Sequence, residues 1–133
     1  MRQLPDAIQK EYVALLSRAV ESLQQEGYED LHVDGLAGYP DPAPLTVRVL
    51  NAPIEPDLTA QRAEQAPLVG FVEVSTDLSI EDTGRRWQWI QAHWLPEHGG
   101  SLAVFVHPED EQRAREIARR WHLDEDVVRP LSS

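Results

Sequence analysis

The sequence contains no cysteine among its 133 residues. Disulfide bonds and thiolate metal sites are therefore excluded, and this composition is typical of cytoplasmic proteins. Long apolar runs are also missing. No stretch approaches the roughly 18 residues of a membrane-spanning helix, and the first residues do not resemble a signal peptide. We therefore expect a soluble, cytoplasmic protein that has no membrane partner.

Lysine is nearly absent, since Lys10 is the only one, and the net charge is −11. Residues 1–84 carry 15 acidic against 5 basic side chains, whereas residues 85–133 carry 8 acidic against 7 basic ones. An acidic surface repels a phosphate backbone. The charge therefore disfavours a nucleic-acid partner, without excluding one that meets the arginines near the C-terminus.

The length and the 41% content of hydrophobic residues predict one folded domain over residues 1–133. Apolar periodicity predicts the element order αβββαβαβ, in which residues 51–66 form a loop or a loop plus an added strand. The expected helices are 5–26, 80–95 and 109–121, and the expected strands are 28–34, 45–50, 68–75, 101–106 and a short one within 124–130. Three successive strands suggest a meander, and the later strand–helix–strand unit suggests a parallel pair. We therefore expect an α/β fold whose mixed sheet is flanked by helices.

The strand expected at 68–75 (LVGFVEVS) carries one charged residue, Glu73, in an otherwise apolar run. A buried charge costs several kcal/mol unless a partner compensates it. Glu73 is therefore the most informative residue of the sequence. It belongs either to a functional site or to an internal ion pair, for which Arg48 of the preceding strand is the nearest partner by strand order.

The order αβββαβ with an acid in the third strand resembles the PD-(D/E)xK, or restriction-endonuclease-like, nuclease superfamily. Pro56-Asp57 matches the first element of the family's motif, and Glu73-Val74-Ser75 matches the second up to its last residue, which is lysine in the family. The resemblance covers roughly residues 5–108 and rests on the order of the elements. It implies a restriction-endonuclease-like fold in which Asp57 and Glu73 converge on one pocket and bind a divalent metal.

The residue at the position of the family's lysine determines whether the motif can catalyse hydrolysis. Strand alternation would send residues 73 and 75 to the same face, so Ser75 takes the place of the catalytic lysine. Serine supplies no positive charge, and an arginine such as Arg48 would be a poor proton carrier. Ser75 thus marks a vestigial catalytic position and no cofactor is required. Any surviving site at Asp57 and Glu73 would take Mg²⁺ or Mn²⁺, which prefer carboxylate oxygens.

The Pro-Asp pair that begins the motif occurs three times in the sequence, at 5–6, 40–41 and 56–57. Asp57 is preferred since it lies between the second and third expected strands. Asp41 or Asp34 would replace it if the loop 35–44 folds over the site. The structural alternative for Asp57 is a turn residue that follows proline.

The helix expected at 80–95 has an apolar core stripe and a polar face that carries one large apolar side chain. At 100° per residue the core stripe comprises Ile80, Thr83, Trp87, Ile90 and Trp94. Trp89 falls on the opposite side, flanked by Arg85, Arg86 and His93. Tryptophan and arginine are enriched at interface hot spots, so these four residues predict a homodimer contact. The alternatives are a cover from the protein's own chain and stacking on a nucleic-acid base.

These observations leave three classes of function open. The first is a degenerate, non-catalytic PD-(D/E)xK-like domain that acts as a binding or assembly module. The second is a magnesium-dependent nuclease or phosphodiesterase whose catalytic cation has been relocated. The third is a generic α/β interaction protein in which Glu73 is only salt-bridged. We favour the first class.

Overall fold

The computed structural model describes residues 4–46, 53–63, 65–75 and 78–131. Within them the chain forms a five-stranded sheet in the order β1-β2-β3-β4-β5. The strands are β1 (Glu29–Val33), β2 (Leu58–Gln61), β3 (Leu68–Val72), β4 (Ser101–Val106) and β5 (Val128–Pro130). The pairs β1–β2 and β2–β3 are antiparallel, whereas β3–β4 and β4–β5 are parallel. The predicted mixed α/β sheet is confirmed.

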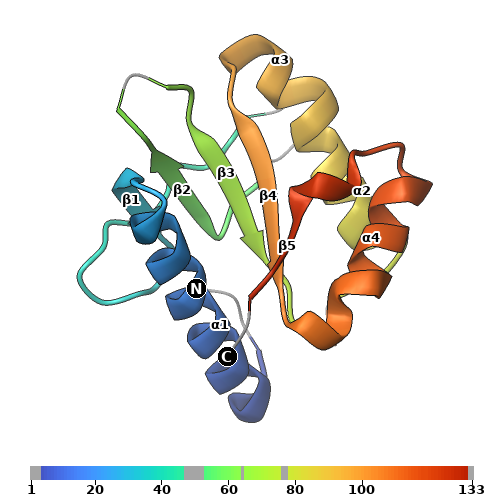
Figure 1. Ribbon diagram of the computed structural model, residues 1–133, viewed down its shortest axis with the longest axis horizontal. Coiled ribbons are helices and arrows are strands. Elements are labelled where there is room, and N and C mark those ends of the chain that lie inside the picture. Colours follow the sequence, from blue (N-terminus) through green and yellow to red (C-terminus); the bar gives the residue numbers. More distant parts are fainter. Residues whose placement is uncertain (1–3, 47–52, 64, 76–77, 132–133) are drawn as a thin grey trace.

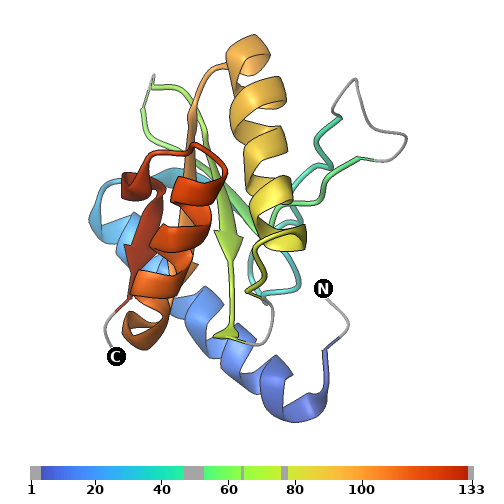
Figure 2. The ribbon, with the colours of Figure 1, turned by 90° about the vertical axis from the view of Figure 1, so that its right-hand side faces the viewer.

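Helices cover both faces of this sheet (Figures 1 and 2). Helix α1 (Asp6–Gln25) lies on one face. The other face carries α2 (Asp82–Trp89), the π-helix η2 (Ile90–Trp94), α3 (Leu95–His98) and α4 (Glu111–Arg120). Two short 3₁₀ turns, η3 (Pro108–Asp110) and η4 (Glu125–Val127), flank α4. None of the helices in the described part of the chain combines the length and the apolar character that crossing a membrane requires.

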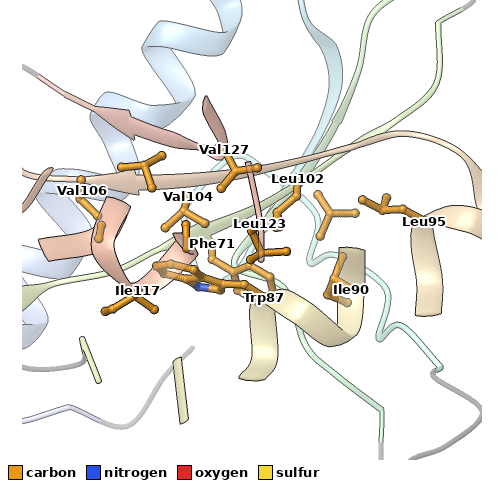
Figure 3. Packing of buried hydrophobic residues seen from close by; sticks show 14 of the residues in the cluster. Phe71, Trp87, Ile90, Leu95, Leu102, Val104, Val106, Ile117, Leu123 and Val127 are labelled. Atoms are coloured by element: carbon orange, nitrogen blue, oxygen red, sulfur yellow. The ribbon is translucent and has the colours of Figure 1, made fainter. Parts of the chain in front are cut away.

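Strand β3 separates two apolar clusters, and all five of its residues are buried. Leu68 and Val72 belong to the cluster under α1, and Val69 and Phe71 belong to the cluster under α2 and α4. This alternation is what a strand covered on both faces requires. Figure 3 shows the second cluster, in which the indole of Trp87 lies among the neighbouring core side chains. Asp57 and Glu73, which lie beside this strand, are buried as well.

The second expected strand requires a correction. Residues 47–50 of the predicted strand 45–50 lie outside the described residues, and Leu45 forms an isolated antiparallel bridge with Ile54. The strand that pairs with both β1 and β3 is β2, inside the segment 51–66. The alternative of a loop plus an added strand is thus the one found. Its sequence, LTAQ, has little strand propensity. The strand is stabilised by its pairing with β1 and β3 and not by its local sequence.

The helix expected at 80–95 departs from regular α-helical geometry. It begins at Asp82, changes to a π-helix at Ile90 and ends at His98, before Gly99 at φ +77°. The wide π turn places Leu95, five residues after Ile90, in the core, where α-helical spacing predicted Trp94. Ile80, also predicted in the core stripe, precedes the helix and is 43% exposed.

The remaining elements agree with the sequence. Helix α1, strands β1 and β4, helix α4 and the short C-terminal strand β5 occur where they were predicted, with ends shifted by a few residues at most. The exception is the strand expected at 68–75, which ends at Val72. The backbone N–H of Glu73 still bonds to the C=O of Phe105 on β4, and residues 74–75 follow the sheet.

Candidate functional site

Asp57 precedes β2 and is held by the protein's own donors. It is 2% exposed. The hydroxyl of Tyr12, on α1, donates to its Oδ1 at 2.6 Å, and the N–H of Val72 donates to its Oδ2 at 2.7 Å. Its backbone N–H also donates to the C=O of Gly70 at 3.1 Å. Hydrogen bonds to an ionised group contribute about 1.5–3 kcal/mol each. Asp57 therefore links α1 to the end of β3 through hydrogen bonds.

Glu73 follows β3 directly and has no exposed surface. Its backbone N–H continues the ladder to the C=O of Phe105 at 3.0 Å. Its Oε1 accepts from Nη2 of Arg86, on α2, at 2.5 Å. The guanidinium of Arg86 also lies over the ring of Phe71, with Cζ 5.1 Å from the ring centroid. This ion pair fastens α2 to the end of β3.

The two acids thus make these contacts with helices on opposite faces of the sheet. Asp57 bonds to α1 and Glu73 bonds to α2, and three of their four carboxylate oxygens accept from protein donors. A divalent cation would have to displace these donors, so the acids as they lie do not fit a metal. Among the described residues, no group of three or more His, Asp or Glu side chains is placed to hold a metal ion.

Ser75 has a different neighbour from the one that strand alternation predicted. Its hydroxyl donates to Oδ2 of Asp110 at 2.6 Å, and Asp110 lies in η3 after β4. Because β3 ends at Val72, the position of Ser75 is set by this turn contact and not by the sheet. The bond links the chain after β3 to the chain after β4.

The alternative first acids lie elsewhere. Asp41 is exposed, and its Oδ1 accepts from the N–H of Gly35 at 3.3 Å within the loop after β1. Asp34 donates its backbone N–H to the C=O of Asp57 at 2.9 Å. Arg48, predicted as a partner of Glu73, lies outside the described residues.

The four predicted interface residues divide into two groups. Arg85 and His93 are exposed, as a contact surface requires. Arg86 instead reaches Glu73, and Trp89 is partly buried against the core cluster under α2. Trp89, predicted on the side of the helix opposite the core stripe, is therefore partly covered by the protein's own chain.

Sequence reasoning missed Tyr12 and Arg86 as the partners of the two acids. A signal existed for Tyr12, because a tyrosine in the apolar stripe of a helix needs a hydrogen-bond partner for its hydroxyl. Arg86 lies at the border of the core stripe, one residue before Trp87. Its long side chain can reach inward from there, and the position alone does not say so. Comparison with family models, with curated proteins and with solved structures gives no match to this chain.

Proposed function

We propose that this chain is a non-catalytic, restriction-endonuclease-like domain that acts as a binding or assembly module. One observation carries the proposal: the two acids of the PD-(D/E)xK-like motif are bonded to the protein's own side chains and backbone. Tyr12 and Arg86 use these acids to attach helices to the sheet. The motif then stabilises the fold. The cation beside Glu73 in the described part of the chain is Arg86, an arginine in place of the family's lysine.

The order of strands and helices supports the same proposal. An antiparallel β1-β2-β3 meander, a crossover through α2 and a parallel β4 form the αβββαβ core that the resemblance implies. Such an ancestry accounts for a glutamate at the end of a buried strand. The net charge of −11 also disfavours binding to a nucleic-acid backbone.

The runner-up is a metal-dependent nuclease with a relocated cation. It is favoured by Arg86, which is 31% exposed and places a positive charge beside Glu73. Arginine stabilises anions well but transfers protons poorly, so in this alternative it would orient phosphate and would not activate water. Mg²⁺ or Mn²⁺ would then have to compete with Arg86 for Glu73.

The two candidates differ in one assay. We expect no cleavage of single- or double-stranded DNA above background in either Mg²⁺ or Mn²⁺, because the carboxylates are already engaged. Glu73→Gln, which keeps the size of the side chain, serves as the paired control. Metal-dependent cleavage by the wild type that Glu73→Gln abolishes would establish the nuclease and overturn our proposal. Cleavage that appears only in Ser75→Lys would support descent from a nuclease.

Assembly forms the second half of the proposal. The partner we propose is a second copy, which would meet the exposed part of Trp89 together with Arg85 and His93. Residues 85–133 are nearly neutral, whereas residues 1–84 carry a charge of −10. Two copies therefore repel each other least when their C-terminal halves face.

A further inference from the structure

A cavity of about 470 Å³ lies where β4 begins. It is bounded by the first residues of β4, by residues 122–127 and by Gln91 of the π-helix η2. Figure 1 shows these segments together at the end of the sheet near α3. The volume falls within the range of small-ligand sites, about 300–1,000 Å³. The cavity is lined by none of the residues of the motif around Asp57 and Glu73.

One wall of this cavity is an unpaired strand edge. Strand β5 pairs with β4 only from Val104 onward, where Val104 lies opposite Val128. The ladder stops there because Val127 donates its N–H to the C=O of Asp124 within η4. Backbone groups of alternate residues face the same neighbour, and the C=O of Val106 faces β5. The N–H and C=O of Leu102 therefore point to the side where β5 is missing.

The side chains around this edge have an apolar floor and an acidic rim. Leu102, Leu123 and Val127 form the floor and are at most 9% exposed. Asp124 and Asp126 lie exposed at the rim beside His122, and Oδ1 of Asp124 also accepts from the backbone N–H of Asp126 at 2.9 Å. Arg129 also lines the cavity, but its Nη1 lies 3.3 Å from a carboxylate oxygen of Glu26, so its charge is compensated. The rim thus attracts a positive group.

We propose that this cavity binds the free amino terminus of a peptide whose first residue is apolar. The ammonium group lies between Asp124 and Asp126, the first side chain packs on the apolar floor, and the first peptide group pairs with the backbone of Leu102. A peptide end presents a cation, an apolar side chain and a backbone amide in this order. The inference goes beyond the proposed function and stands whether or not the Glu73 site is catalytic.

The test is a titration followed by the backbone amide signals in two-dimensional NMR, with the dipeptide amide Val-Ala-NH₂ as the probe. We expect the signals of Ser101, Leu102 and Val127 to shift and saturate. Acetylation of the probe's amino group should weaken binding by about tenfold or more, since it removes the cation. Butylamine, which has a cation but no peptide group, should leave the Leu102 signal unshifted.

Two variants locate the site. Asp126→Asn should weaken binding by about twofold to fivefold, as the loss of an exposed ion pair does, whereas the matched Asp6→Asn on α1 should not. Ser101→Trp should block the cavity from an exposed position, so its fold is preserved. No shift at Leu102 up to saturating probe, equal binding of the acetylated peptide, equal shifts with butylamine, or unchanged binding in Ser101→Trp would each overturn the proposal.

Discussion

At the scale of single residues, Glu73 shows how a buried acid is compensated by an arginine from a neighbouring helix. Glu73 is fully buried, and its charge is compensated by Arg86. Such a pair adds little to stability over apolar residues of the same size, because both charges lose water. Removing one partner is much costlier, since it leaves the other charge buried and uncompensated. A single substitution at either Glu73 or Arg86 should therefore destabilise the fold.

Arg86→Ala should lower the free energy of unfolding by about 3 kcal/mol, the lower end of the range for a broken buried pair. The lower end applies because Arg86 is 31% exposed, so water can enter in its place. Chemical denaturation of the wild type and the variant measures this difference. The neighbouring, exposed Arg85→Ala is the matched control and should change stability by no more than about 0.5 kcal/mol.

The double variant Glu73→Leu/Arg86→Leu tests whether Arg86→Ala is destabilised by the unpaired charge of Glu73 or by the loss of side-chain volume. Because it leaves no buried charge, it should recover most of the stability that Arg86→Ala loses. Equal stability of Arg86→Ala and Arg85→Ala would show that Glu73 does not depend on Arg86.

At the scale of elements, α2 and α4 approach each other at Gly84. A Cβ atom built on Gly84 would lie 2.1 Å from the indole of Trp121. The Nε1 of Trp121 donates to the C=O of Ile80, which fixes the ring against the start of α2. Here glycine is needed for the close approach and not for backbone freedom, since Gly84 lies inside a helix.

Gly84→Ala should lower the free energy of unfolding by about 1–3 kcal/mol through overpacking, although alanine is the better helix former. In a Trp121→Ala background the same substitution should cost less, because the clash with the indole is gone and the closest remaining contact is Cγ2 of Ile117 at 3.0 Å. Thermal and chemical unfolding of the four proteins of this cycle give the coupling energy. An equal cost with and without Trp121 would show that the indole is not its cause.

At the scale of the whole molecule, charge governs assembly. A net charge of −11 makes two copies repel each other, so any dimer needs an apolar centre and the less acidic half of the surface. The exposed part of Trp89 with Arg85 and His93 offers such a place. The chain has no cysteine, so a dimer cannot arise from an intermolecular disulfide.

We expect light scattering to show a dimer whose population rises with salt, because salt screens the repulsion between the copies. Trp89→Ala should shift the protein to the monomer, whereas His93→Ala, at the rim of the same surface, should have a smaller effect. A monomer at every concentration and salt level would remove assembly from the proposed function.

The sequence by itself determined the elements with strong periodicity. The apolar stripe of α1, the continuous apolar run of β4 and the buried run of β3 each predicted their element, since burial repeats with a period that the residues reveal. It also singled out Glu73 as a buried acid. It left open whether the segment 51–66 contains a strand, so β2, with its LTAQ sequence, was one of two alternatives. It did not reveal the π turn, which buries Leu95 more deeply than Trp94.

Only the tertiary structure decided the partners of the acids. Tyr12 and Asp57 are 45 residues apart, and Arg86 and Glu73 are 13 apart across a sheet end and a helix. No local sequence pattern predicts these contacts, because they depend on which strands pair and on which face of the sheet each helix covers. The early end of β3 likewise turned Ser75 toward Asp110. Sequence fixes the period of burial along an element, whereas contacts between elements depend on the whole sheet being assembled.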